Sequence, residues 1–471
     1  MLYRICVFFF SVEMIGKRKW PLVRLFLLLT LTLVIVFVFC KYNSDGLRLT
    51  NFKTRDRPLN LITQHNVASG RNVTETIDLI IHSSEFLIIS NETRTSFLVR
   101  LAICSPLTAP LVFIVEGFRS GLGSYINNFL LVAMYALQQG RCSRIIIDRS
   151  SWPHAYIVTD LIEQYSMGWV TVVSNLHGIH YPVGHDVTNI TQEFSLLMFD
   201  GPKRGKRGPG HWIPWMENIP RLLDMSSSFE KKKLVTQTFL TPTLQLRAYV
   251  ALLMQIILCG NDLHKPCFRL GDTKDNFISV HIRSGDKIGS EMHYIPCEKY
   301  VNSAVNLMSQ SPSIDAIFVL SDNTTMEDVF ELNFLLHTAT ILPMRKFRVF
   351  NMRSLTRAAK FAFDNNAQGR QYFLQQSCMT SEKLDIFLTL AQKSQLNPDG
   401  YRGNKHADDR KTLGDIDNRL HAKDLFVYWF LAAQAKHIVC TFSSNVCRLM
   451  ALLRPQLLSS IISLDDSWTP F

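Results

Sequence analysis

The sequence predicts an α/β fold in which two Rossmann-like halves face a cleft. Apolar, strand-like runs alternate with helical segments from about Ser105, and a second series of such runs begins near Asn276. In the second series, the strand-like runs end in charged or hydroxyl side chains. This alternation is typical of parallel sheets covered by helices. Because ligands of open α/β sheets bind beyond the carboxyl ends of the strands, we expect these polar ends to line the cleft.

The first half has the pattern of a βαβ unit. Pro110–Glu116 is an apolar run typical of a strand, and a glycine-rich turn follows it over residues 117–123. Ser124–Gln139 is then expected as a long helix, and Ser143–Asp148 as the next buried strand. A single glycine cluster is weak evidence for a dinucleotide-binding motif, so it indicates only the fold.

The second half is expected to contain three strands, a preceding helix and an irregular region. Leu240–Leu258 has the length and apolar content of a helix. The expected strands are Phe277–Arg283, Ala316–Asp322 and His437–Phe442. Ala362–Arg410 is predicted to be irregular, with loop-like stretches at Asn365–Arg370 and Asn397–Lys405.

Composition narrows the class of ligand. Of the 471 residues 47% are hydrophobic and 19% charged, which is typical of a folded globular protein. A net charge of +11 suits an anionic ligand, a membrane surface or nucleic acid. The sequence contains no zinc-finger spacing and no RNP-like aromatic motif, so we expect no nucleic-acid partner. It also lacks an HExxH pair, and no metal site is predicted.

The N-terminal segment predicts a membrane anchor. Leu25–Cys40 carries no charge, and with Pro21–Val23 added and Arg24 snorkelling it is long enough to span a bilayer. Cations precede it, which favours a cytoplasmic tail over residues 1–20, although other cations follow it. A cleaved signal peptide is the alternative, but no A-x-A-like site follows Cys40. We expect an uncleaved signal-anchor over residues 21–40 and a stem over residues 41–104.

This topology would place the rest of the chain in the secretory lumen. Asn72, Asn91 and Asn189 begin N-x-[ST] sequons and are candidates for glycosylation. Asn323 begins a fourth sequon, but it directly follows Asp322, so we expect it to carry no glycan.

The cysteine pattern agrees with an oxidising compartment. Eight cysteines lie beyond the predicted span, and this even number permits up to four disulfides. Cys259 and Cys267 are close enough in sequence for a local disulfide, but the sequence alone does not fix the pairing.

Polar groups follow all three expected strands of the second half. They are Arg283-Ser284-Gly285-Asp286-Lys287, Ser321-Asp322 and Thr441–Asn445, and Glu291 comes four residues after Lys287. Ser443 or Ser444 could cap a helix over Asn445–Leu453, whose N–H groups would then face an anion. Taken singly, a solvated turn or a plain N-cap explains each motif. Their convergence predicts a pocket for a nucleoside diphosphate.

These motifs resemble the α-1,6-fucosyltransferase family, which fucosylates the innermost GlcNAc of N-glycans. In the second half, VHIRSGDKIGSE (Val280–Glu291) is similar to the family's VHVRRTDKVGTE, IFVLSD (Ile317–Asp322) to VYLATD, VCTFSSNVCR (Val439–Arg448) to VCTFSSQVCR, and SLDD (Ser463–Asp466) to its closing SLDD. In the first half, SGLGSYINN…IIIDRSSW (Ser120–Trp152) is similar to GCGYGCQLHH…LILESQNW.

The resemblance implies a GT-B transferase with an acceptor-side domain over residues 105–275 and a GDP-fucose-binding domain over residues 276–471. The reaction would be metal-independent, would invert the anomeric carbon and would use no cofactor beyond the donor. The implied partners are GDP-fucose and a glycan or glycoprotein acceptor, with a homodimer compatible with the sequence. The implied location is the Golgi membrane, as a single-pass type II protein.

The resemblance also assigns roles to individual residues. Glu291 would be the base that deprotonates the acceptor hydroxyl, while Arg283 and Lys287 would neutralise the departing β-phosphate. Asp286 would orient these cations. The residues implied to contact the donor are His281, Arg283, Asp322, Ser443, Ser444 and Asn445, and the implied disulfide joins Cys440 to Cys447.

The sequence departs from the family at several positions. The family's second arginine is Ser284 here, its glutamine after the paired serines is Asn445, and an expected aspartate falls on Tyr428, with Asp424 one turn earlier. The sequence also ends shortly after SLDD, without the family's C-terminal SH3 domain. The alternatives are therefore a fucosyltransferase of another linkage (α-1,2 or protein O-fucosylation) and a catalytically silent, membrane-anchored glycan- or nucleotide-binding relative.

Overall fold

The structure is a computed structural model that divides into Met1–Gly70 and Arg71–Phe471. It describes residues 73–83, 228–260, 277–284, 293–393, 415–454 and 460–465, with strands and short helical stretches between residues 111 and 200. The predicted tail and anchor, residues 1–40, lie outside these described residues. Among the helices that are described, none is long and apolar enough to cross a membrane.

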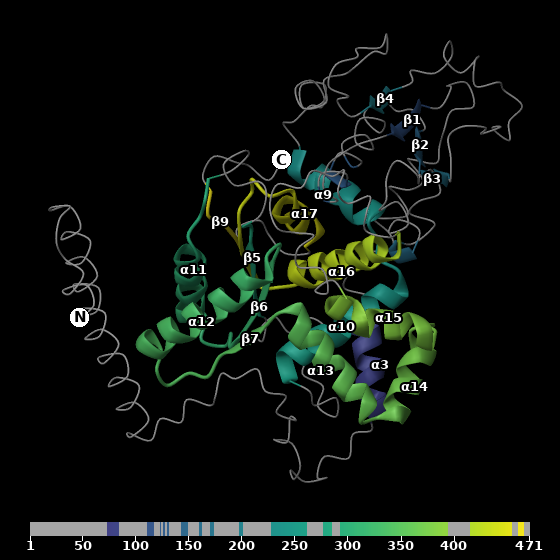
Figure 1. Cartoon of the computed structure of the whole chain (residues 1–471). Coiled ribbons are helices and arrows are strands. Elements are labelled where there is room, and N and C mark those ends of the chain that lie inside the picture. Colours follow the sequence, from purple (N-terminus) through teal and green to yellow (C-terminus); the bar gives the residue numbers. More distant parts are fainter. Residues whose placement is uncertain are drawn as a thin grey trace, which may run out of the picture. The chain divides into compact units, whose positions relative to one another are not determined.

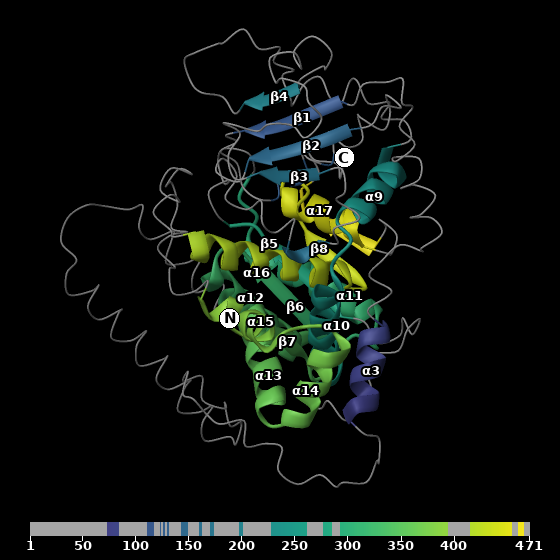
Figure 2. The same ribbon diagram turned by 90° about the vertical axis from the view of Figure 1, so that its right-hand side faces the viewer.

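The first half contains a parallel sheet, as the sequence predicts. Its strand order is β3-β2-β1-β4, built from β1 (Leu111–Glu116), β2 (Ser143–Asp148), β3 (Val170–Val173) and β4 (Leu197–Asp200) (Figure 2). All three pairings are parallel. Of the expected helix 124–139, the described residues Ile126, Asn127 and Leu130 are helical.

The second half contains a five-stranded parallel sheet in the order β7-β6-β5-β8-β9. Its strands are β5 (Ile278–Ile282), β6 (Ala316–Ser321), β7 (Arg348–Phe350), β8 (His437–Cys440) and β9 (Ile461–Ser463). The three central strands coincide with the three predicted ones. Their apolar, β-branched residues are buried on both faces, which is why they form the interior of a parallel sheet.

Helices cover both faces of this second sheet (Figure 1). On one face, Val280 packs with α11 (Cys297–Gln310) and α12 (Thr324–Ile341). On the other, Phe318 packs with α10 (Leu244–Cys259), α13 (Met352–Asp364) and α16 (Asp415–Ala433). The remaining helices of this half are α14 (Ala367–Gln376), α15 (Ser381–Lys393) and α17 (Asn445–Leu453).

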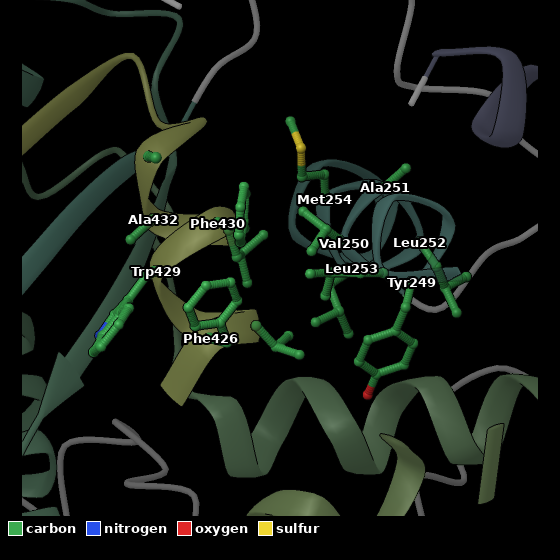
Figure 3. Close-up of a cluster of buried hydrophobic side chains, with 14 of the residues drawn as sticks. Tyr249, Val250, Ala251, Leu252, Leu253, Met254, Phe426, Trp429, Phe430 and Ala432 are labelled. Carbon is green, nitrogen blue, oxygen red and sulfur yellow. The ribbon is translucent and has the colours of Figure 1, made fainter. Parts of the chain in front are cut away.

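The centre of the core is the contact of α10 with α16 and α15. The side chains of α10 are buried all round, and the close-up shows its residues 249–254 facing Phe426 and Phe430 of α16 (Figure 3). Tyr249 stacks on Phe387 of α15 with ring centroids 4.8 Å apart, and its hydroxyl donates to the Phe387 carbonyl at 3.2 Å. α10 is therefore an interior helix, which explains its near-continuous apolar sequence.

The prediction of an irregular region over Ala362–Arg410 is wrong for its first part. Residues 367–376 form α14 and residues 381–393 form α15, whereas 394–414 lie outside the described residues. Asn365–Arg370 was expected to be a loop because of its asparagines and its glycine. Asn366 instead caps α14 by accepting the Gly369 N–H at 2.7 Å, and Gly369 is buried where α14 meets α3.

Helix α3 (Val73–Ser83) lies within the predicted stem but packs into the globule. Its residues Val73, Ile77 and Ile80 are buried and belong to the core beside α10 and α14. Both ribbon views place α3 beside α14 (Figures 1 and 2). The stretch from residue 73 to residue 83 is therefore part of the folded unit. The other predicted domain limits remain predictions.

The disulfide between Cys440 and Cys447 is present and joins β8 to α17, with Cα atoms 6.0 Å apart. Cys259 is also disulfide-bonded. Cys297 and Cys378 are free, so not every cysteine beyond the predicted anchor is paired.

Candidate functional site

The candidate site lies where the strand order of the second sheet reverses. β5 has β6 on one side and β8 on the other, so the chain leaves neighbouring strands in opposite directions. In open α/β sheets, the crevice at such a switch point is the usual place for a ligand. The three segments that the sequence selected therefore meet at one edge: Arg283-Ser284 after β5, Asp322 after β6, and Thr441–Ser444 after β8.

Arg283 is held by Asp322 across the ends of β5 and β6. Its Nη1 lies 2.5 Å from Oδ2 of Asp322, and the side chains are 17% and 9% exposed. The other carboxylate oxygen, Oδ1, accepts the Ser284 N–H at 2.9 Å and the Ser284 hydroxyl at 3.3 Å. Asp322 therefore orients Arg283 directly. The sequence expected this orienting role of Asp286, which lies outside the described residues.

Carboxylates hold the segments on both sides of Arg283, and the one on the β6 side is buried. On the β6 side, Glu327 in the first turn of α12 accepts the Ser321 N–H at 3.2 Å and lies 3.5 Å from Arg353 of α13. Burial raises the pKa of Glu327 to about 8, while Arg353 and the Ser321 N–H act in the opposite direction. The Ser321 hydroxyl donates to the Ile282 carbonyl at 2.8 Å and ties β6 to β5.

On the β8 side, Asp465 holds the turn that leads into α17. Its carboxylate accepts the Phe442 N–H at 2.7 Å and the Ser443 N–H at 2.8 Å. The Ser463 hydroxyl donates to the same carboxylate and is also the acceptor of the Phe442 N–H at 3.1 Å. The closing SLDD motif therefore has a structural role, because it fixes the backbone of the paired-serine segment.

Helix α17 begins where the sequence predicts, but its N-cap differs from the expectation. Ser444 is the N-cap, yet its side chain makes no capping hydrogen bond. The N–H groups of the first turn lie outside the intrahelical ladder and give this end a partial positive charge. The Ser444 side chain therefore does not cap the helix, while the helix does begin at the sheet edge as expected.

Gly123 and Asn127 of the first half contact this same helix end. Asn127 donates from Nδ2 to the Asn445 carbonyl at 3.1 Å and to the Gly123 carbonyl at 3.0 Å. A Cβ on Gly123 would lie 3.3 Å from the Cβ of Asn445, so a larger residue would press on α17. The two halves therefore meet at the start of α17. Asn127 lies within the SGLGSYINN motif, but no role was predicted for it from the sequence.

His281 is buried behind Arg283 rather than exposed in the crevice. It alternates with Ile282 on β5 and shares the face of Ser279, whose hydroxyl donates to the Ala432 carbonyl of α16. Burial, with the charge of Arg283, lowers the pKa of His281 to about 3, so the imidazole is neutral. Its Nδ1 has no hydrogen-bond partner among the described residues.

Tyr428, which replaces an expected aspartate, belongs to a buried polar cluster. Burial, reinforced by the charge of Asp424, raises the pKa of Tyr428 well above its usual value, so its hydroxyl stays protonated. Asp424 is 2% exposed and hydrogen-bonds to Tyr428. The carboxylate one turn earlier on α16 therefore hydrogen-bonds to the tyrosine that stands where the resemblance predicts an aspartate.

Several predicted site residues cannot be placed. Asp286, Lys287 and Glu291 lie outside the described residues, so their roles remain predictions. Glu327, Asp465 and Asn127 are the site residues that sequence reasoning missed. The signal for Asp465 was present in the SLDD motif, but no role was attached to it.

The chain has only a low similarity to known proteins. No protein-family model matches the chain, and no curated protein matches it. Among solved structures, the chain is similar to a mutant of FUT1 from Arabidopsis thaliana in complex with GDP, with 11% identity, a TM-score of 0.36, and coverage of 81% of this chain and 79% of that one. A likeness this low transfers neither activity nor ligand to this chain.

Proposed function

We propose that this protein is an inverting, metal-independent glycosyltransferase that moves fucose from GDP-fucose to a glycan. The acceptor we propose is a GlcNAc of an N-glycan in an α-1,6-type reaction. The observation that carries the proposal is the pairing of Arg283 with Asp322 beside the N-terminus of α17, at the switch point of a parallel sheet. A fixed cation and a helix N-terminus at this place suit a diphosphate.

The chemistry of a single displacement explains what each group would do. As the sugar leaves the nucleotide, negative charge grows on the β-phosphate, and preorganised cations stabilise it without reorganising. Asp322 holds Arg283 in such a fixed position. Lys287 would add a second cation, and Glu291 would remove the proton from the attacking acceptor hydroxyl.

A secretory location fits one further feature of the structure. The Cys440–Cys447 disulfide is stable in an oxidising compartment and would be rare in the cytosol. We therefore propose a type II protein of the Golgi membrane with its folded part in the lumen.

The alternative is a catalytically silent relative that binds GDP without transferring sugar. The observation that favours it is the position of Ser284, which stands where the family has a second arginine. Its N–H and its hydroxyl both donate to Asp322. Ser284 therefore does not supply the phosphate contact that the family's second arginine would make.

A transfer assay with Glu291→Gln decides between these proposals. The full-length chain is incubated with GDP-fucose and an array of glycan acceptors, with and without EDTA. We expect transfer to GlcNAc-terminated N-glycans, unaffected by EDTA, and a fall in kcat of about 10²–10⁴-fold in the variant with GDP binding retained.

The matched control removes a carboxylate that is exposed at the start of α11. Glu298→Gln should keep the wild-type kcat. GDP binding without transfer to any acceptor, together with no effect of Glu291→Gln, would select the silent relative. Transfer to galactose or to Ser/Thr would select another linkage.

A further inference from the structure

Lys232 on α9 (Ser228–Phe239) is a buried cation placed beside another cation. Its side chain is 6% exposed, and burial together with the charge of Arg448 lowers its pKa to about 8. No carboxylate among the described residues forms an ion pair with it or raises its pKa. An apolar side chain such as methionine could fill the same space without this electrostatic cost, so the charge itself needs an explanation.

The packing of α9 against α17 locates Lys232 at the candidate site. Both ribbon views show the two helices side by side (Figures 1 and 2). At their far ends, Gln237 donates from Nε2 to the Arg454 carbonyl at 3.1 Å. Lys232 lies about one and a half turns before Gln237 on α9, and Arg448 lies about as far before Arg454 on α17. Because Lys232 and Arg448 also interact, through their charges, α9 and α17 run in the same direction. Lys232 is therefore level with the first turns of α17.

Arg448 brings its charge to the same place. Its Nη2 donates to the Ser443 carbonyl at 3.4 Å, so the guanidinium folds back towards the turn between β8 and α17. The N–H groups of Phe442 and Ser443 in that turn are already taken by Asp465. Lys232, Arg448 and the first turn of the helix are positive groups that the described residues bring to this end of α17.

We propose that Lys232 and Arg448, with the first turn of α17, bind a phosphate group of the nucleoside-diphosphate donor. The inference rests on the proposed function, and it adds a residue from outside the second sheet to the site. Arg283 approaches the switch point from β5, and Lys232 approaches it from α9 beyond β8. A phosphate group bound at the first turn of α17 would offset the repulsion between the charges of Lys232 and Arg448.

The test measures ligand binding by the full-length chain with isothermal titration calorimetry. The ligands are GDP, guanosine and inorganic pyrophosphate, and the variants are Lys232→Met, Lys232→Arg and the control Lys360→Met, which removes an exposed lysine of α13. We expect Lys232→Met to weaken GDP and pyrophosphate binding about tenfold or more, which is the loss of one charge-assisted phosphate contact. Guanosine binding should stay within about twofold, Lys232→Arg should recover most of the affinity, and Lys360→Met should match the wild type.

A readout of folding keeps the result unambiguous. Because Lys232→Met removes a buried charge, its melting temperature without ligand should equal or exceed that of the wild type, while the increase caused by pyrophosphate should shrink. Lys232→Gln serves as the second variant if methionine prevents folding.

The outcomes separate this inference from the proposed function. Unchanged GDP and pyrophosphate binding in Lys232→Met, or an equal loss for guanosine, would overturn the phosphate contact even if the wild type transfers fucose. Lys232-dependent pyrophosphate binding by a protein that neither binds GDP nor transfers sugar would support an anion site and defeat the fucosyltransferase proposal.

Discussion

At the scale of single residues, the side-chain carboxyl groups of three acidic residues hold the hydrogen-bond donors of the candidate site in place. Asp322 fixes Arg283, Asp465 fixes the turn before α17, and Glu327 holds the Ser321 N–H next to Asp322. Of these three, Glu327 has a raised pKa because burial penalises its charged form. A change of pH should therefore alter the protonation of Glu327 next to the carboxyl end of β6.

Glu327 should make the stability of the protein fall as pH rises. The glutamate pKa is 4.5 before burial and about 8 in the folded chain, so the folded state binds more protons between these values. The free energy of unfolding should therefore decline across this window and level off above about pH 8. Urea titrations of wild type and Glu327→Gln between pH 5 and pH 8 measure the effect. The variant should lose a slope of up to about 1.4 kcal/mol per pH unit.

Asp328→Asn is the matched control for this measurement. Asp328 also pairs with Arg353, at 2.9 Å, but its side chain is 64% exposed. Its variant should keep the wild-type slope. An identical slope in Glu327→Gln and wild type would show that Glu327 is ionised throughout and that the raised pKa is wrong.

At the scale of elements, α3 and α14 pack so closely that a glycine is required between them. A Cβ on Gly369 would lie 2.9 Å from Cγ1 of Val73 and 3.0 Å from the side chain of Asn366. Glycine within a helix normally costs about 1 kcal/mol relative to alanine. Here that cost is offset by the close approach of the two helices.

Gly369→Ala should accordingly destabilise the chain, although alanine is the better helix former. We expect a loss of about 1–3 kcal/mol in the free energy of unfolding, because the added methyl overpacks the contact. A double-mutant cycle with Val73→Ala checks the cause, since the cost of Gly369→Ala should be smaller in that background. Equal costs in the two backgrounds would mean that Val73 is not the obstacle.

The same contact shows what the sequence could and could not predict about the elements. The strands around Val280, Ile317 and Val439 were predicted because buried parallel strands carry a local signal of apolar, β-branched residues. Helix α14 was missed because its glycine and its capping Asn366 read locally as a loop. The reason for Gly369 lies on α3, nearly 300 positions earlier, and no local pattern contains it.

The candidate site, like the elements, was predicted where the signal is local and missed where it depends on tertiary contacts. The sequence located Arg283, Asp322 and the paired serines because they directly follow strands, and strand order then brought them together. It did not reveal that Asp322 binds Arg283, that Asp465 binds the serine turn, or that α9 carries Lys232 to α17. These contacts depend on which elements become neighbours, and that is a property of the tertiary packing.

At the scale of the whole molecule, the architecture is two parallel α/β sheets in one chain, with strand orders β3-β2-β1-β4 and β7-β6-β5-β8-β9. The polar groups that suit a diphosphate belong to the second sheet, while the first contributes Asn127 at the start of α17. This arrangement suits the proposed donor site on the second half, while the assignment of the first half to the acceptor stays a prediction. We therefore expect the edge between β5 and β8 to bind the donor.

A crystal structure of the full-length chain with GDP tests this claim most directly. We expect electron density for the diphosphate between the Arg283 guanidinium and the first turn of α17. Lys232 and Arg448 should lie within hydrogen-bond distance of a phosphate oxygen. GDP bound at the strand ends of the first sheet, or a diphosphate with no contact to Arg283 or α17, would contradict it.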